Sequence, residues 1–233
     1  MTRLRRLLVP VLSTLVMLAL LLGLGTWQVE RLAWKEGLLA QIARAEARPA
    51  VPLGDTPEPF AKVRASGTFR TGLTALYGSQ GHDTPAGPML GAQLLAVLDR
   101  PGQAPLLVDR GWVPTAPNGA PGPLPAPPAG ETVVEGFVRQ PDHPGPFSAA
   151  DDPVQRRFYT LDPVAIGHAL GLATVAPFTL VAMGPPQPGQ SPVPAEALPR
   201  PVNNHLSYAI TWYGLAVVLL VIFVLYARKV LRP

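Results

Sequence analysis

The residues best placed for chemistry form one short run, NNHLSYAITW, at positions 203–212 of the 233-residue chain. Helical spacing places His205, Tyr208, Ala209, Trp212 and Ala216 on one face of a helix. A histidine above such a face of aromatic and small residues could ligate the iron of a haem lying against the helix. The alternative from the residues alone is an interfacial histidine that bonds to water or lipid headgroups beside ordinary interfacial aromatics.

A second group of candidate residues, Trp27 and Arg31, lies near the other end of the chain. The four-residue spacing places them on one helix face. Trp27 could face the same haem from this helix, or it could pack at a membrane interface. The Arg31 guanidinium could pair with the haem propionates, or it could reach the phosphates of lipids.

The remaining composition argues against most other functions. The chain has no cysteine, which excludes disulfides, thiolate nucleophiles and zinc fingers, and its four methionines are too scattered for a copper carrier. His82, His143 and His168 each lack a second ligand at metal-binding spacing, and Asp151–Asp152 is typical of a turn. We therefore predict that the protein is not an enzyme.

Two apolar runs frame the chain and must position these residues. Residues 7–26 and 205–227 are both long enough to cross a bilayer, which takes roughly 20 helical residues. The basic tails at 1–6 and 228–233 should both face the cytoplasm and account for the net charge of +4, so no nucleic-acid partner is predicted. A cleaved signal peptide is the alternative for the first run, but its length favours an uncleaved anchor. We expect a two-pass protein of the bacterial inner (plasma) membrane, or of the mitochondrial inner membrane in a eukaryote.

The segment between the runs predicts a helix followed by a β-rich domain. Apolar residues recur at helical spacing over 27–48, and the Arg48–Pro49 step ends the helix. Residues 49–204 form the predicted β-rich domain on the outer side, the periplasm or intermembrane space. Its candidate strands are short, bounded by turn residues and often alternating in polarity: Val63–Phe69, Leu73–Gly78, Met89–Leu98, Ala104–Val113, Thr132–Gln140, Arg157–Leu161 and Pro177–Ala182.

One helix and two proline-rich segments complete the predicted domain. Asp162–Pro163 is a typical helix start, and Gly171 a plausible end. Residues 114–130 predict a long loop, and residues 184–201 a semi-rigid tether to the second membrane helix. The predicted fold is thus a membrane α+β protein: two transmembrane helices flank a small antiparallel sheet or partly closed barrel, which carries one or two helices.

Four motifs, in order along the chain, carry a family resemblance. They are Gly25–Thr26–Trp27–Gln28 with Arg31, Trp34 and Lys35; Val63–Phe69; Asp109–Arg110–Gly111–Trp112–Val113–Pro114; and Asn203–Tyr213. With them the chain resembles the Surfeit locus protein 1 family, assembly factors of haem–copper terminal oxidases. The first and last motifs are the specific ones. One departure is Gly87–Pro88–Met89, which stands where the family usually has aromatic-containing sequence.

The resemblance implies a function around insertion of haem a into the catalytic subunit of cytochrome c oxidase. It implies His205 as the haem ligand and matches Trp27 and Trp212 to tryptophans of the family. The implied partners are that subunit, other assembly factors and the lipid bilayer. The alternative is a cofactor-free scaffold that holds an immature oxidase subunit through strand edges and the Trp112–Val113–Pro114 corner.

Overall fold

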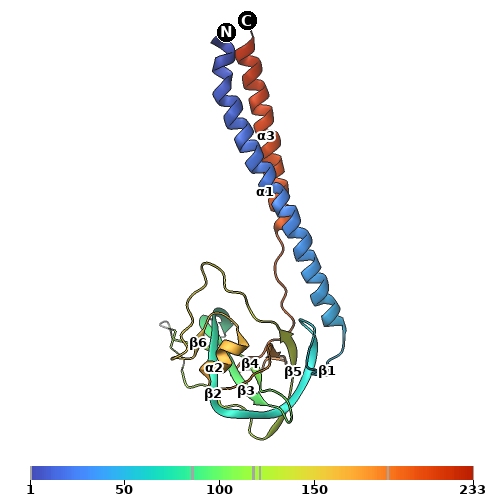
Figure 1. Cartoon of the computed structure of the whole chain (residues 1–233), viewed down its shortest axis with the longest axis vertical. Coiled ribbons are helices and arrows are strands. Elements are labelled where there is room, and N and C mark those ends of the chain that lie inside the picture. The colour runs from blue at the N-terminus through green and yellow to red at the C-terminus, as the bar shows by residue number, and fades with distance from the viewer. Residues whose placement is uncertain (1, 85–86, 117–118, 121, 188, 233) are drawn as a thin grey trace. The chain divides into compact units, whose positions relative to one another are not determined.

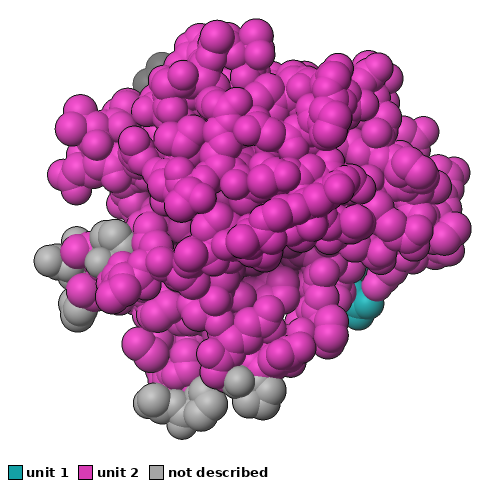
Figure 2. Space-filling view, turned by 90° about the horizontal axis from the view of Figure 1, so that it is seen from below, with its two compact units in different colours: residues 1–41, 200–233 teal, residues 42–199 magenta. Residues whose placement is uncertain are grey.

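The computed structural model describes residues 2–84, 87–116, 119–120, 122–187 and 189–232, with the backbone alone for residues 2–6. The chain divides into two compact units. Residues 1–41 and 200–233 form the helix unit, and residues 42–199 form the β unit; Figure 2 colours them separately. Each unit is described by itself.

The helix unit is a pair of long helices that lie side by side (Figure 1). Helix α1 spans Thr2–Ala47, and its last turns belong to the β unit; helix α3 spans His205–Leu231. Both are long and apolar enough to cross a membrane, in agreement with a two-pass protein. Small buried residues, Ala209 and Ala216 of α3, lie where the helices pack. Most of the large apolar side chains on both helices point outward, which suits lipid rather than water.

The β unit contains seven strands and one helix among its described residues. The strands are β1 (Val51–Pro52), β2 (Lys62–Thr84), β3 (Gly87–Asp99), β4 (Leu106–Pro114), β5 (Glu131–Arg139), β6 (Arg157–Phe158) and β7 (Thr179–Ala182), and the helix is α2 (Pro163–Ala169). The Asp162 side chain caps α2 by accepting hydrogen bonds from the Val164 and Ala165 N–H groups, and Pro163 opens the helix, which confirms the predicted start.

The strands close into a ring, and the sheet is mixed rather than antiparallel. Neighbours pair in the order β2–β3–β4–β7–β5, and β5 pairs with β2 again. The prediction of a purely antiparallel sheet is wrong because β7 is parallel to β4, and the short strands β1 and β6 are parallel to β2. Strands β4 and β5 run in opposite directions, so a strand inserted between them must be parallel to one of the two.

Strand β2 closes the ring because its two halves pair with different strands. Residues Lys62–Thr68 pair with β5, and residues Thr68–Thr84 pair with β3. The sequence predicts two strands here, broken after Phe69. The structure has one long strand with a shift of pairing register between Phe69 and Thr74. Such an irregularity bends a strand without ending it.

The core of the β unit lies on both faces of β3. Ala96 and Leu98 point into the ring with Phe178 and Leu180, and Leu95 points to the opposite face. On that face Leu95 and Val97 pack against a second cluster that includes Phe158 and the α2 residue Ile166. A strand buried on both faces reads as a continuous apolar run, as LLAVL does at 94–98.

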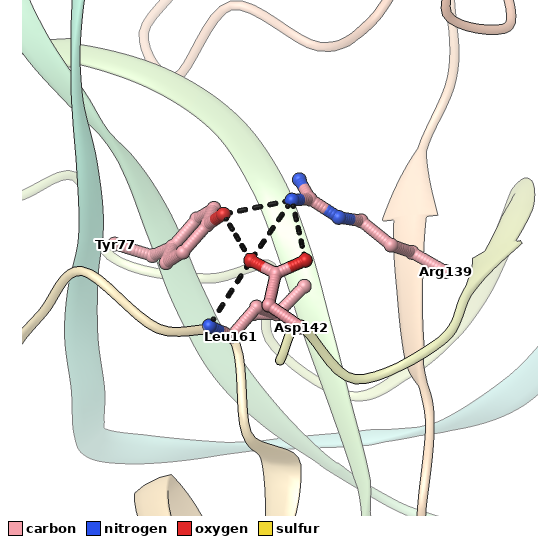
Figure 3. Close-up of polar contacts among 4 residues, drawn as sticks. All are labelled: Tyr77, Arg139, Asp142 and Leu161. Carbon is pink, nitrogen blue, oxygen red and sulfur yellow. Dashed lines mark hydrogen bonds and ion pairs between the residues drawn. The ribbon is translucent and has the colours of Figure 1, made fainter. Parts of the chain in front are cut away.

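A polar network ties β2, β5 and the following loop together at the edge of this second cluster (Figure 3). The Arg139 guanidinium bonds to the Tyr77 hydroxyl at 2.7 Å and to Asp142 at 3.1 Å, and the Tyr77 hydroxyl donates to Asp142 at 2.6 Å. Asp142 also accepts from the Leu161 N–H. Burial, followed by the bond to Asp142, raises the pKa of Tyr77 to about 12. Arg139, Tyr77 and Asp142 therefore each make at least two hydrogen bonds in this network.

The second proline-rich segment is more than a tether. Val193 exchanges two backbone hydrogen bonds of 2.8 Å with Trp112, and Ala195 bonds to Ala182 and Gly184. We call residues 193–199 the strap. Trp112 and Val113 are buried. The predicted contact surface at the Trp112–Val113–Pro114 corner is therefore wrong, because two of its three side chains are inside the fold.

Candidate functional site

The candidate site lies in the helix unit, where α1 and α3 approach closely. A Cβ at Gly25 of α1 would be 2.8 Å from the ring of Tyr213 on α3, so the ring lies directly against the backbone of α1 and would have to move for a larger residue. One residue later the Thr26 hydroxyl lies 3.2 Å from the Tyr213 hydroxyl. The small residue and the hydrogen bond fix how this stretch of α1 meets the first turns of α3.

His205 is held across the same contact. Its Nδ1 lies 2.7 Å from Oε1 of Gln28, and the Gln28 side chain is only 8% exposed. An amide oxygen only accepts, so with Oε1 toward the ring Nδ1 is the protonated nitrogen. Nε2 is then the nitrogen with a free lone pair. This arrangement, in which one ring nitrogen donates to a neighbour and the other is left to bind, is the one found at metal-ligating histidines.

The start of α3 places the imidazole at the helix end. Asn204 is the N-cap residue but its side chain makes no capping bond; instead the Asn203 carboxamide accepts from the His205 N–H at 3.4 Å. The Ser207 hydroxyl donates to the Asn204 carbonyl at 2.8 Å. His205 is half-buried, and its ring contacts Gln28 through Nδ1.

The predicted aromatic face of α3 is divided between packing and exposure. Ala209 and Ala216 are buried, whereas Tyr208 is 54% exposed. Trp212 is half-buried, and its Nε1 is buried without a hydrogen-bond partner among the residues the structure describes. A buried indole N–H normally finds a partner, so the one of Trp212 is an exception in this unit.

The α1 candidates lie on the exposed surface of their helix. Trp27 is 52% exposed. The Arg31 guanidinium lies 4.0 Å from the ring centroid of Trp34, within cation–π range, and Lys35 approaches the same ring at 6.0 Å. Arg31 is thus held near Trp34, a contact that the spacing of Trp27 and Arg31 does not predict. A contact between Arg31 and a propionate stays a prediction.

Sequence reasoning missed Gln28 as a site residue. Gln28 is the only uncharged polar side chain that α1 buries among its described residues. It stands three residues after Gly25, which is the spacing that puts it on the same helix face. This spacing from Gly25 is the sequence feature that could have indicated Gln28. Aromatic residues are expected at membrane interfaces, which favours Trp27 as a candidate, but Gln28 is the residue that contacts His205.

The side chains at this site have the chemistry needed to hold a haem, with His205 as the axial ligand of the iron. His205 has an oriented ring and one free nitrogen, Trp212 has an unpartnered N–H, and Tyr208 and Trp27 add exposed aromatic surface. Elsewhere, in the part of the chain that the structure describes, no three His, Asp or Glu residues group as metal ligands. His82 instead stacks on Trp112 with ring centroids 4.9 Å apart.

Comparison with known proteins agrees with the motifs. The model of the SURF1 family matches residues 15–217. A SURF1-like protein of Rickettsia felis is 28% identical over 94% of this chain and 97% of its own length. Surfeit locus protein 1 of Mus musculus is 28% identical and that of Homo sapiens 26% identical, each over 83% of this chain and over 67% and 69% of their own lengths. Because the family model spans both helices and the β unit between them, the chain belongs to the SURF1 family.

Proposed function

We propose that this protein is a non-enzymatic assembly factor for a haem–copper terminal oxidase and that it holds haem a through His205 during insertion into the catalytic subunit. The observation that carries the proposal is the 2.7 Å contact between His205 Nδ1 and Gln28 Oε1. It orients the imidazole from the neighbouring helix and, with Nδ1 as the donor, would leave Nε2 to bind the iron. Membership of the SURF1 family supports the oxidase as the destination.

Each candidate residue has a distinct role in this proposal. His205 Nε2 would bind the iron, and Gln28 would keep the ring in position. Trp27, Tyr208 and Trp212 would contact the porphyrin, with the Trp212 N–H available for a polar group at its edge. Haem a would supply an iron that accepts the imidazole nitrogen as an axial ligand. The protein itself would perform no bond-making step: it binds, orients and releases.

Both apolar helices support a location in the membrane that houses the oxidase. That membrane is the inner (plasma) membrane in a bacterium and the mitochondrial inner membrane in a eukaryote, with both termini in the cytoplasm or matrix. The partners would be the catalytic subunit and other assembly factors. A haem held at the end of α3 would lie at the membrane boundary, where an apolar macrocycle with charged propionates is best accommodated.

The test is the absorption spectrum of protein purified from cells that make haem a. The wild-type protein should carry a Soret band, and His205→Ala should lose at least nine-tenths of it. His168→Ala is the matched control, because His168 is an exposed histidine on α2 in the other unit. Equal haem content in the wild type and His205→Ala would refute His205 as the ligand.

A second function, a cofactor-free scaffold for an immature oxidase subunit, is supported by a different observation. Phe147 is fully exposed on a turn held by two hydrogen bonds between Gly145 and Ser148, and Val154 nearby is 94% exposed. Fixed and exposed apolar side chains on a loop suit a protein contact. A colourless protein that co-purifies with the oxidase subunit, and loses it in Phe147→Ala, would favour the scaffold.

A further inference from the structure

The β unit contains a cavity of about 380 Å³ between the ring of strands and the strap. Strands β2, β3, β4, β5 and β7 line it on one side, and strap residues from Val193 to Pro199 line it on the other. The volume lies in the range of pockets that bind small molecules or single side chains. All of its lining residues belong to one unit, and none belongs to the site around His205.

The strap lies close over β4 because Gly111 has no side chain. A Cβ at Gly111 would be 2.1 Å from the Val193 carbonyl oxygen, and the Gly111 φ of 122° also disfavours other residues. The two hydrogen bonds between Trp112 and Val193 then fix the strap. The cavity is therefore built by specific contacts rather than left by loose packing.

Asp109 of β4 lines this cavity and has no cationic partner. It is 3% exposed, and its Oδ1 accepts a 3.0 Å hydrogen bond from the Gly111 N–H. Over the described residues, no other hydrogen bond and no ion pair reaches its carboxylate. Burial raises the pKa of Asp109 to about 7, which the Gly111 bond and the charge of Arg139 only partly oppose. A buried carboxylate without a counter-ion is costly, and a bound cation would relieve that cost.

Arg139 lines the same cavity but its charge is already matched. Its guanidinium bonds to both oxygens of Asp142 and to the Tyr77 hydroxyl, and it stacks on the Tyr77 ring at 5.0 Å (Figure 3). The Arg139–Asp142 pair is neutral as a unit. The other charged or titratable side chains that line the cavity are His82 of β2 and Glu196 of the strap, both exposed. Asp109 is thus the buried carboxylate of the cavity without an ion-pair partner among the described residues, and Glu196 adds a second, exposed acidic group.

The side chains that line the cavity suit a ligand that has a charged group on an apolar stem. Trp112, stacked on His82, offers an aromatic surface, and Phe137 and Val181 add apolar area. The Trp112 indole N–H already donates to the Gln80 carbonyl, so the ring contributes its face rather than its polar edge. Aromatic faces attract cations at distances up to about 6 Å from the ring centroid.

We propose that this cavity binds an organic cation, an ammonium or guanidinium group on a short apolar stem, with Asp109 as its counter-ion. The cation would come either from a free amine or from a lysine or arginine side chain of a partner protein. The assignment is independent of haem binding and concerns a different unit of the molecule.

The proposal has a defined pH dependence. A cation pairs with the ionised carboxylate, so above about pH 7 Asp109 is ready to bind. Below that pH a proton must first leave Asp109, and the affinity should fall about tenfold for each pH unit. His82 and Glu196 also line the cavity, and Arg139 stays paired with Asp142.

The experiment is a calorimetric titration of the full chain in detergent micelles with n-butylammonium chloride. At pH 8 we expect saturable binding, at least tenfold tighter than that of 1-butanol, and binding weaker by about tenfold at pH 6. Asp109→Asn should lose at least tenfold in affinity. Asp99→Asn is the matched control, because Asp99 is a partly exposed carboxylate paired with Arg70 outside the cavity.

A second variant keeps the test decisive if Asp109→Asn is poorly folded. Ala197 is exposed at the strap side of the cavity, so Ala197→Trp should block binding while thermal unfolding is unchanged.

The peptide acetyl-Gly-Lys-Gly-amide separates the two sources of the cation. Binding tighter than that of n-butylammonium indicates a side chain of a partner protein, and weaker binding indicates a free amine. Equal affinities for n-butylammonium and 1-butanol, or unchanged binding in both variants, would overturn the proposal.

Discussion

The helix unit and the β unit fix their polar residues in opposite ways. In the helix unit one hydrogen bond, from His205 to Gln28, orients the key side chain among apolar neighbours. In the β unit Arg139, Tyr77 and Asp142 share several bonds, so each keeps a partner when one bond is lost. A single bond permits a ring to reorient when a ligand binds or leaves, whereas a network preserves shape. The orientation of His205 thus depends on one side-chain bond, whereas the positions of Arg139, Tyr77 and Asp142 depend on several shared bonds.

The largest effect should come from the core of the β unit. Phe158 is 1% exposed between the ring and α2, and Phe158→Ala should lower the free energy of unfolding of the β unit by about 3–5 kcal/mol. Loss of the β-sheet circular dichroism signal in urea measures this. The helix signal should persist at the same urea concentration. Phe147→Ala, at a fully exposed position, is the control; simultaneous loss of both signals in Phe158→Ala would contradict two independent units.

The next effect concerns the buried carboxylate. The pKa of Asp109 is raised from 3.8 to about 7 in the folded protein, so the folded state binds more protons than the unfolded state between these values. Stability from Asp109 is therefore lost as pH rises from about 4 to 7. Asp109→Asn keeps an acceptor for the Gly111 N–H and cannot ionise. We expect it to be more stable than the wild type by about 4 kcal/mol at pH 8, because each pKa unit corresponds to about 1.4 kcal/mol.

The measurement is the difference in melting temperature between Asp109→Asn and the wild type at several pH values. The difference should be small at pH 4 and grow by several degrees up to pH 7. Asp99→Asn serves again as the control, because Asp99 is paired with Arg70 and partly exposed. A difference that stays constant from pH 4 to pH 8 would show that Asp109 does not titrate in this range.

A smaller effect should follow from loss of the single bond in the helix unit. Gln28→Leu removes the acceptor for His205 Nδ1, and a hydrogen bond of this kind is worth about 1 kcal/mol. We expect about fivefold weaker haem retention and, in haem-free protein, loss of the preference for the Nδ1–H tautomer in the ¹⁵N spectrum of the ring. Gln28→Glu keeps an acceptor and should keep both properties. An unchanged tautomer in Gln28→Leu would show that Gln28 does not position the ring.

The smallest effect should be that of Arg31. Arg31→Gln removes a cation held 4.0 Å from the Trp34 ring, and we expect about twofold weaker haem retention with normal membrane insertion. Arg31→Lys keeps the charge and should retain more haem than Arg31→Gln. Haem content per protein measures both. If it is the same in both variants and the wild type, Arg31 serves only as an anchor.

The sequence predicted those parts of the fold that depend on local patterns. The start of α2 at Asp162–Pro163 and the strands that became β3 to β5 follow from turn residues, capping and strand-type composition. The direction of β7 was missed because strand patterns carry no information about which neighbour a strand joins. The packing of the strap was missed for a related reason: proline-rich composition predicts stiffness, but the bond between Val193 and Trp112 connects positions 81 residues apart.

The candidate site shows the same division. Helical spacing placed Ala209 and Ala216 on one face with His205, Tyr208 and Trp212, but in the structure the two alanines are buried while Tyr208 is exposed. Spacing along one helix cannot reveal a partner on another, so Gln28 and the close approach of Gly25 to Tyr213 were invisible. The sequence indicates Asp109 only as the first residue of the Asp109–Pro114 motif and predicts no separate role for it. It lies in a cavity formed by several strands and the strap, which are far apart in the sequence, so no local pattern encodes its burial.

The place of β7 in the ring has a consequence for the order of events during synthesis. Strands β4 and β5 are joined through β7, whose residues Thr179–Ala182 follow all the other strands in the chain. The ring therefore stays open, with the pairing edges of β4 and β5 unsatisfied, until those four residues have left the ribosome. The 22 residues 183–204 separate them from α3. The β unit is therefore the last part of the chain to be completed before the second apolar helix.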